Sequence, residues 1–432
     1  MQVWNWDKQT QKKVKRDFAF HFDKEIFKKV NRILAEVRQF GDVAVRRFTR
    51  QFDGIDLPLK RLQVAQSDIN RAFETINVEF VPILRQITEN VKEYYERELK
   101  QSFEITGKDG VKLAKRYQPL ERVGLYIPGG TAPLVSTVYM TVIPAKVAGV
   151  KEIVIATPPN RTTGEIDPHI LAVANLLGVN EIYRMGGAQA IGAMAFGTRT
   201  VRKVDKIAGP GNAYVAEAKR QVYGFADIDM VAGPSEVAII ADASADADYV
   251  TCDLLAQAEH AGGIPYLITN SKRLIEAIRK RVDNGFIIQV KTMAEACDVV
   301  NDIAPEHLEI LTEDPEKLVG SIQHAGAIFL GPYSPAVVGD YIAGPSHVLP
   351  TGGTARYFSP LSASSFVKST QVISYTREAL KNSREHVRQL TEMEGLYLHR
   401  ISLEARFVDR AAPAAETVLS KPEEKGESDE AQ

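Results

Sequence analysis

Several polar residues in the second half of the chain have the types and spacing for metal binding. Gln257 and His260 lie three positions apart in "DLLAQAEHAGG", where an amphipathic pattern ends at two glycines. Side chains at i and i+3 leave a helix on one face, so both could reach one ligand. A histidine in the last helical turn is also commonly a cap that interacts with the helix dipole. The stretch alone leaves both interpretations open.

A second motif places a carboxylate beside an imidazole. In "DIAPEHLEIL", Glu306 and His307 follow a proline, near a predicted helix start. Such a pair can serve as base and proton relay when the surroundings move the two pKa values apart. The alternative is a glutamate that stabilises a helix N-terminus beside an exposed histidine. The motif is therefore a candidate catalytic pair.

Further metal donors occur in other segments. Asp340 and His347 lie in the Gly/Pro-rich stretch "VGDYIAGPSHVLPTGG", which is typical of a functional loop, and "EMEGLYLHR" contains Glu394 and His399. Turn chemistry and an amphipathic helix end are the ordinary alternatives. The sequence has no HExxH motif and no cysteine cluster, so a zinc site would combine donors from distant segments. The available donors are Gln257, His260, Asp340 and His399.

Three glycine-rich turns suit a nucleotide. "YIPGGTAP" (126–133), "MGGAQAIGA" (185–193) and "AGPGNAYVAEAKR" (208–220) each follow a predicted strand. Glycine lets a phosphate approach the backbone, and a helix N-terminus carries partial positive charge. Each turn alone could be an ordinary strand-to-helix connection, and none is a full GxGxxG motif. Together, at one edge of one sheet, they favour a dinucleotide.

The elements that position these residues alternate between strand and helix. Residues 126–233 predict repeated βαβ units, and a second α/β unit begins at "SEVAIIAD". Residues 24–102 and those after 359 have apolar residues at helical spacing. We therefore expect an α/β fold with two facing, doubly wound (incomplete Rossmann-like) domains, an α-helical N-terminal arm and a helical C-terminal extension.

Composition narrows the class of protein. The 432 residues predict about two to four domains. A net charge of -2 at pH 7 argues against nucleic acid or an anionic membrane as a partner. Cys252 and Cys297 are too few for a disulfide framework, which fits a reducing compartment. No apolar stretch has signal-peptide or membrane-spanning length, so we expect a cytoplasmic protein.

Seven motifs, taken together and in order, resemble the histidinol dehydrogenase family. They are "RMGGAQAIGAMAFGT", "AGPGNAYVAEAKRQV", "DMVAGPSEV", "DLLAQAEH", "NDIAPEHLEI", "GPSHVLPTGGTAR" and "EGLYLHR", and the resemblance covers nearly the whole chain. It implies oxidation of L-histidinol to L-histidine through L-histidinaldehyde with two NAD, the last step of histidine biosynthesis. It also implies a homodimer with shared active sites and one Zn²⁺ per subunit.

The resemblance also implies residue roles. It makes Gln257, His260 and Asp340 zinc ligands, with the partner subunit's His399 completing the protein set. His307 becomes the base that takes the alcohol proton, and Glu306 the base that activates water for the second oxidation. Substrate contacts are implied at Ser235, Gln257, His260, Glu306, His307, Asp340, His347, Glu394 and His399, and NAD contacts at Tyr126, Gln189 and Asn212.

Two other functions are weighed against this one. They are a zinc- and NAD-dependent dehydrogenase of another small polar alcohol, such as a sulfonated diol, and a non-catalytic zinc- and nucleotide-binding module. His347, Glu394 and the full metal set argue for an imidazole substrate. The segment "AGGIPYLIT" after His260 is shorter and more glycine-rich than the resemblance leads us to expect, which concerns the local loop.

The expected domain boundaries follow the changes of pattern. A first α/β domain combines a helical leader in residues 22–125 with residues 234–358, and the NAD-contacting domain comprises residues 126–233. We further expect an arm at a dimer interface in 1–21, a helical dimerisation extension in 359–418, and a disordered tail in 419–432. The tail is charged and lacks large apolar groups, so burial could not offset its ordering entropy.

Overall fold

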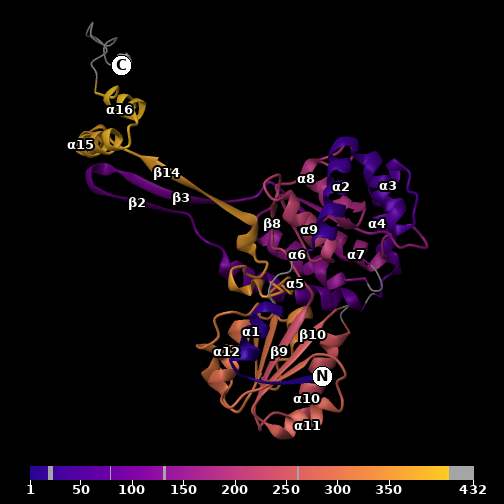
Figure 1. Cartoon of the computed structure of the whole chain (residues 1–432). Coiled ribbons are helices and arrows are strands. Elements are labelled where there is room, and N and C mark those ends of the chain that lie inside the picture. The colour runs from indigo at the N-terminus through magenta and orange to yellow at the C-terminus, as the bar shows by residue number, and fades with distance from the viewer. Residues whose placement is uncertain (18–22, 78, 130–132, 260–261, 408–432) are drawn as a thin grey trace, which may run out of the picture. The chain divides into compact units, whose positions relative to one another are not determined.

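The chain divides into two compact units. The computed structural model describes residues 1–17, 23–77, 79–129, 133–259 and 262–407. The first unit comprises Met1–Lys100 and Pro119–Lys368, and the second Gln101–Gln118 and Ser369–Gln432. The first contains two parallel sheets and the second a three-stranded sheet, whose elements are labelled in Figure 1.

One sheet of the first unit has five parallel strands in the order β6-β5-β4-β7-β8. Counted along the chain from β4, this order is 3-2-1-4-5, that of an incomplete Rossmann sheet. Alternate residues of its four strands β4 to β7 enter the two hydrophobic clusters on the two faces of the sheet, as Ile155 and Val154 do. The strands are β4 (Arg122–Tyr126), β5 (Glu152–Thr157), β6 (Glu181–Arg184), β7 (Lys206–Ala208) and β8 (Asp227–Ile228).

Helices cover both faces of this sheet. The hydrophobic cluster on one face includes residues of α4, α5, α6 and α7, and the cluster on the other includes residues of α2, α3, α8 and α9. Helix α2 buries Val30, Ile33, Leu34 and Val37, which share one helical face. The helices are α2 (Lys24–Phe40), α3 (Asp42–Asp53), α4 (Gln66–Thr75), α5 (Phe80–Glu98), α6 (Val135–Val147), α7 (Pro168–Leu176), α8 (Gly187–Phe196) and α9 (Ala213–Val222).

The other sheet of the first unit has six parallel strands in the order β1-β11-β10-β9-β12-β13. Counted from β9, its last five strands repeat the order 3-2-1-4-5. The strands are β1 (Gln2–Asn5), β9 (Glu236–Ala241), β10 (Ile264–Thr269), β11 (Phe286–Gln289), β12 (His307–Leu311) and β13 (Ala327–Leu330).

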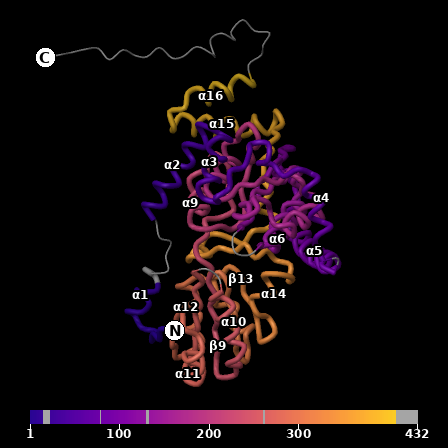
Figure 2. Tube along the Cα trace, turned by 90° about the vertical axis from the view of Figure 1, so that its right-hand side faces the viewer, coloured from indigo at the N-terminus to yellow at the C-terminus, as the bar shows by residue number. Residues whose placement is uncertain are grey.

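Helices also cover both faces of the six-stranded sheet. Residues of α1 and α12 pack on one face and residues of α10 and α11 on the other, so α12 and α10 flank β9 in Figure 2. Two shorter helices, α13 and α14, follow β12 and β13. The helices are α1 (Lys8–Asp17), α10 (Ala247–Ala258), α11 (Lys272–Arg279), α12 (Met293–Ile303), α13 (Glu316–Val319) and α14 (Ala336–Tyr341).

The second unit combines a small sheet with two helices. Strands β2 (Phe103–Thr106) and β3 (Lys112–Pro119) pair antiparallel, and β14 (Val367–Ser374) joins them at β3. Helices α15 (Arg377–Met393) and α16 (Tyr397–Glu404) follow. The second unit also contains the short 3-10 helix η2 (Lys108–Gly110), whereas η1 (Leu59–Arg61), η3 (Thr354–Arg356) and η4 (Ala363–Phe366) lie in the first unit.

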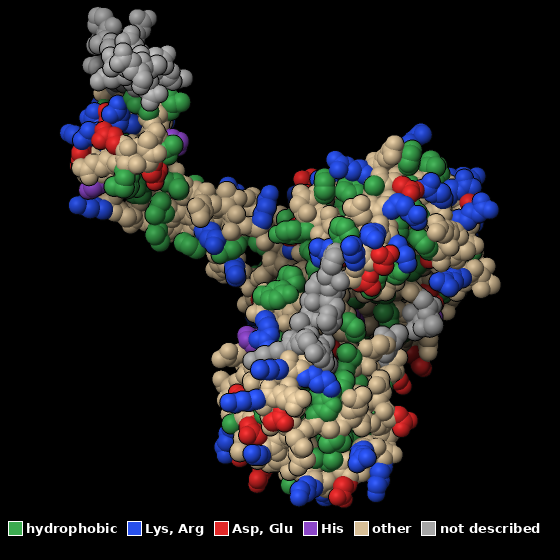
Figure 3. Space-filling model, in the orientation of Figure 1, with side chains coloured by type: hydrophobic (Ala, Val, Ile, Leu, Met, Phe, Trp, Pro, Cys, Tyr) green, Lys and Arg blue, Asp and Glu red, His purple; other side chains and the backbone are tan. Residues whose placement is uncertain are grey.

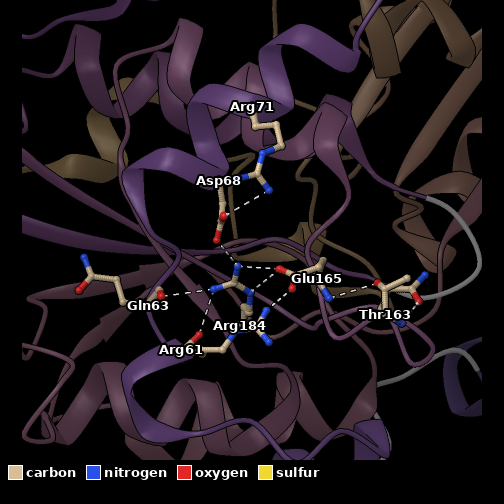
Figure 4. Close-up of polar contacts among 8 residues, drawn as sticks. Arg61, Gln63, Asp68, Arg71, Thr163, Glu165 and Arg184 are labelled. Carbon is tan, nitrogen blue, oxygen red and sulfur yellow. Dashed lines mark hydrogen bonds and ion pairs between the residues drawn. The ribbon is translucent and has the colours of Figure 1, made fainter.

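A buried arginine fixes the end of β6 (Figure 4). The guanidinium of Arg184, only 1% exposed, donates to the Asp68 carboxylate at 3.0 Å and to Glu165 at 2.7 Å. It also donates to the backbone carbonyl oxygens of Arg61 and Gln63. Because the arginine is buried and fully paired, it ties β6 to the leader segment just before the second glycine-rich turn.

The expectation of an α/β fold with two parallel sheets is confirmed, but the segments are grouped differently from the expected boundaries. The helical leader packs on the five-stranded sheet, and β4 lies at the centre of that sheet although most of it precedes the expected boundary at residue 126. Gln2–Asn5 form an edge strand on β11, and the extension 359–418 contains β14. A strand of four residues such as β1 carries too little periodicity to be predicted from one sequence.

Candidate active site

The candidate catalytic pair lies at the start of a buried strand. Helix α12 ends before Ala304, whose φ of +53° is left-handed, and β12 begins at His307. The predicted helix start at this motif is therefore wrong, because the apolar residues of "HLEIL" belong to a strand buried on both faces. Glu306 and His307 are 7% and 5% exposed, so the alternative of an exposed histidine is excluded.

Glu306 accepts two hydrogen bonds from the segment that enters β9. The Ser235 hydroxyl donates to its Oε2 at 2.5 Å, and the backbone N–H of Glu236 donates at 3.0 Å. Burial nevertheless raises the pKa of Glu306 above its ordinary value. A carboxylate with a raised pKa is a stronger base than an ordinary glutamate, which suits proton abstraction.

The ring of His307 is held at both nitrogens. Nδ1 lies 3.3 Å from the carbonyl oxygen of Glu236 and donates to it when it carries the hydrogen, which leaves Nε2 to accept a proton. Nε2 is 3.4 Å from Oδ1 of Asp340. Burial lowers the pKa of His307, but the charges of Glu306 and Asp340 outweigh it and raise this pKa to about 9.

Asp340 and His347 are brought to the same place. Asp340 lies on the short helix α14 and not in the expected loop, since α14 begins at Ala336, four residues before it. His347 does lie in a loop, where its Nδ1 is 2.9 Å from the Asp340 carbonyl oxygen. Its Nε2 is 3.3 Å from the hydroxyl of Thr137, on α6 of the other sheet. The loop thus connects the two halves of the first unit.

The predicted metal ligand Gln257 lies in the helix that leads back to this edge of the six-stranded sheet. It lies in the last turn of α10, is 7% exposed, and its Nε2 has no hydrogen-bond partner among the described residues. Because β10 follows, and Ile264 N–H donates to the Ser235 carbonyl at 3.0 Å, the end of α10 is near the catalytic pair. A buried amide without a partner fits an absent ligand, since rotation can present its oxygen.

Three other predicted site residues remain, namely the metal ligands His260 and His399 and the substrate contact Glu394. His260 lies outside the described residues. Glu394 follows α15 and His399 lies on α16, both exposed and both in the second unit, so their participation stays a prediction. Within the described part of the chain, no three acidic, histidine or cysteine side chains form a group that could hold a metal.

The described parts of the glycine-rich turns lie at the carboxyl edge of the five-stranded sheet. Tyr126 ends β4, and its buried hydroxyl accepts the N–H of Gly187 at 3.0 Å, while burial raises the pKa of Tyr126 to about 12. Gln189 is 1% exposed and its Oε1 has no partner in the described chain, which fits a missing donor. Asn212 caps α9 by accepting the N–H groups of Tyr214 and Val215 at 3.1 Å.

A buried ion pair, which the sequence analysis missed, clamps the third turn. Lys219 Nζ donates to the Gly209 carbonyl at 2.9 Å and pairs with Asp229, which accepts the Gly209 N–H at 2.8 Å. Gly209 has a φ of +117°, and a Cβ there would lie 2.1 Å from the Tyr126 carbonyl oxygen. Only glycine fits, so the turn is held close to the strand edge.

Glu236 is a further buried acid that the sequence analysis missed. It is 2% exposed, and burial together with the charge of Glu306 raises its pKa to about 8. The signal was a charged residue inside the apolar run "SEVAIIAD", since glutamate is rarely buried without a specific partner.

Comparison with known proteins identifies the class. A parallel α/β protein with glycine-rich turns and two buried side chains that can act as general bases, Glu306 and His307, has the features expected of a dehydrogenase. The family model described as histidinol dehydrogenase matches residues 19–407. The chain therefore belongs to the histidinol dehydrogenase family.

Individual relatives agree with this assignment. The histidinol dehydrogenase of Bacillus cereus is 45% identical over 91% of this chain and 96% of its own length. That of Bacillus licheniformis is 48% identical over 88% of this chain and 93% of its own length. The crystal structure of the Elizabethkingia anophelis histidinol dehydrogenase has a TM-score of 0.87 and 33% identity, covering 94% of this chain and 98% of that one.

Two surface properties bear on possible partners. In the part of the chain that the structure describes, we find no helix both long and apolar enough to cross a membrane. Basic and acidic side chains are interspersed on the face seen in Figure 3, in keeping with the net charge of -2.

Proposed function

We propose that the protein oxidises L-histidinol to L-histidine through L-histidinaldehyde, using two NAD, as the last step of histidine biosynthesis. The observation that supports this most is the buried Glu306–His307 pair beside Asp340, in a chain of the histidinol dehydrogenase family. Two successive oxidations need two proton-accepting events, and two neighbouring bases supply them.

In the first oxidation, the neutral form of His307 takes the proton of the substrate hydroxyl at Nε2. Its Nδ1 is directed to the Glu236 carbonyl, which orients the ring. In the second oxidation, Glu306 takes a proton from the water that adds to the aldehyde. Ser235 donates to this carboxylate and orients it. When bound, NAD accepts the hydride and zinc orients the substrate.

The residues that would hold zinc are Gln257, His260 and Asp340 of one chain and the partner subunit's His399. The buried, unpartnered amide of Gln257 and the nearby carboxylate of Asp340 are the observations that fit such a site. The proposal therefore includes a homodimer with shared active sites. Ser235, His347 and Glu394 would complete the contacts with L-histidinol.

Tyr126, Gln189 and Asn212 would contact NAD. The unpartnered Oε1 of Gln189 and the close glycine turns support this part of the proposal. Biosynthesis of an amino acid fits a cytoplasmic location.

The stoichiometry of NADH tests the function. Purified zinc-loaded protein mixed with limiting L-histidinol and excess NAD should form two NADH per substrate consumed, with L-histidine as the product. One NADH with accumulation of the aldehyde, or activity with other small alcohols alone, would assign a different dehydrogenase. Absence of NADH with bound zinc and NAD would assign a binding module.

A further inference from the structure

The segment 340–347 carries two residues of the candidate site but is held by the other half of the first unit. Asp340 is a predicted zinc ligand and His347 a predicted substrate contact, and both follow β13 of the six-stranded sheet. The side chains that hold this segment come from α5 and α6, which pack on the five-stranded sheet. None of these side chains has a part in the proposed chemistry.

Tyr95 on α5 holds the end of the segment beside His347. It is buried, and its hydroxyl accepts the N–H of Ser346 at 2.7 Å and donates to the Leu361 carbonyl oxygen at 3.0 Å. Ser346 is also buried and directly precedes His347. A buried backbone N–H needs a partner, so without this hydroxyl the backbone next to His347 would lose its acceptor.

Tyr139 on α6 holds the other end of the segment, beside Asp340. It is buried, and its hydroxyl donates to the carbonyl oxygen of Tyr341 at 3.1 Å. Asn90 on α5 adds a third contact, since its amide donates to the carbonyl oxygen of Ile342 at 3.0 Å. The two backbone carbonyls that directly follow Asp340 are therefore held by α5 and α6, which are labelled near α14 in Figure 2.

The two functional side chains are also connected within the segment. Nδ1 of His347 is 2.9 Å from the carbonyl oxygen of Asp340. Because Tyr139 holds the residue after Asp340 and Tyr95 the residue before His347, the two hydroxyls act on both ends of a segment that this contact closes. The position of each functional side chain thus depends on the hydroxyl next to it.

We propose that Tyr95 and Tyr139 are positioning residues, which hold His347 and Asp340 in place through the backbone of the segment 340–347. The inference rests on the proposed function for the roles of Asp340 and His347. Because the two tyrosines belong to the half built on the five-stranded sheet, they fix the zinc and substrate groups relative to the half that would bind NAD. Groups that are held in place before a ligand arrives bind it at a smaller entropic cost.

Removal of single hydroxyls tests the inference with little change in side-chain volume. Tyr139→Phe removes the contact next to Asp340. Tyr95→Phe removes the two contacts next to His347. Each variant therefore acts on a different functional side chain and has its own expected result.

Tyr183→Phe is the matched control. Tyr183 is as buried as the other two tyrosines, and its hydroxyl lies 2.8 Å from the Glu181 carboxylate and 3.0 Å from the Thr200 carbonyl oxygen. It packs on the opposite face of the five-stranded sheet from α5 and α6. The control therefore loses a buried, hydrogen-bonded hydroxyl without a change at the segment 340–347.

Zinc affinity is measured on metal-free protein of full length by competition with a chelator, alongside kcat, KM for L-histidinol, KM for NAD and Tm. Tyr139→Phe should weaken zinc binding about threefold to tenfold, as loss of one hydrogen bond does. Tyr95→Phe should raise KM for L-histidinol about threefold to tenfold with kcat little changed. Tyr183→Phe should lower Tm without changing zinc affinity or either KM.

Wild-type zinc affinity in Tyr139→Phe, or wild-type KM for L-histidinol in Tyr95→Phe, would overturn the role of that tyrosine. Equal changes in Tyr183→Phe would overturn both roles. Should a tyrosine variant not fold, Asn90→Ala decides, because this side chain is only half-buried: zinc binding should weaken at least about twofold, and unchanged binding would overturn the inference.

Failure of the proposed function has a different result. Wild-type protein that binds no zinc and forms no NADH from L-histidinol would refute that function, and this inference with it.

Discussion

The two parallel sheets share one strand order but place their polar groups at opposite edges. On the five-stranded sheet, the glycine-rich turns and Tyr126 lie where strands end. On the six-stranded sheet, Glu236 is the first residue of β9 and His307 is the first residue of the adjacent strand β12. In the pairing of these two strands, His307 lies opposite Val237. The same topology thus supports two kinds of site.

The chemistry of the two edges differs in the same way. The carboxyl edge offers backbone N–H groups, glycines and a helix N-terminus, which suit phosphates and a neutral nucleotide base. The amino edge offers carboxylates and an imidazole, which suit a cation and proton transfer. The rule that ligands bind at the carboxyl ends of strands predicts the first site and says nothing of the second.

The largest effect is expected at the amino edge. His307→Asn removes the base that accepts the alcohol proton, so kcat for histidinol should fall by about 10²–10⁴-fold. KM for NAD should change little, because the carboxyl edge is intact. Steady-state kinetics with a Tm measurement would check this, and a variant that is folded and still fully active would exclude His307 as the base.

Glu306→Gln should separate the two oxidations. The amide keeps the size of the side chain but cannot take a proton from water, so aldehyde oxidation should fall about 10²-fold or more while alcohol oxidation is less damaged. Rates are measured separately with histidinol and histidinaldehyde. An equal loss with both substrates would contradict the assignment of Glu306 to the second step.

A substitution at the carboxyl edge of the five-stranded sheet should impair NAD binding and leave the zinc site unchanged. Gly209→Ala places a Cβ 2.1 Å from the Tyr126 carbonyl oxygen at a φ of +117°, so the turn must move. We expect KM for NAD to rise about tenfold, equivalent to about 1.4 kcal/mol, with zinc affinity unchanged. Zinc affinity that falls together with NAD binding would show that the two edges are not separate sites.

The smallest effect is expected for the way in which the free energy of unfolding depends on pH through Glu236. The raised pKa of Glu236, about 8, means that the native protein binds this proton more tightly than the unfolded chain does. Its contribution to stability is complete below the ordinary value of 4.5 and is lost as pH rises toward about 8. The groups around it are Glu306, His307, Tyr266 and the Gly352 N–H.

Glu236→Gln should remove this pH dependence. In metal-free protein, the difference in unfolding free energy between variant and wild type should shift in favour of the variant by at least about 1 kcal/mol from pH 5 to pH 8. Denaturant unfolding at several pH values measures it. Parallel pH profiles would mean that Glu236 is ionised in the native protein.

Much of this arrangement could be predicted from the sequence. The alternation of strand and helix predicted both sheets, and the motifs predicted Glu306, His307, Asp340 and Gln257, which lie at or near one edge. Side-chain type and spacing carry that information. The strand at His307 was missed because a proline suggested a helix start, and β1 because four residues show no period.

The buried charges were harder to predict. In the sequence, Lys219 looks like an ordinary residue of an amphipathic helix and Asp229 like an ordinary turn residue. Their ion pair depends on a contact across the sheet edge. Such pairs become visible only when the fold brings the elements together.

Diffraction at the zinc absorption edge, on crystals grown with zinc and L-histidinol, tests the central claim most directly. The account predicts one ion per chain, about 2.0–2.2 Å from donor atoms of Gln257, His260, Asp340 and the partner subunit's His399, with the substrate beside His307. An ion held by a donor set without Gln257 and Asp340 would contradict it.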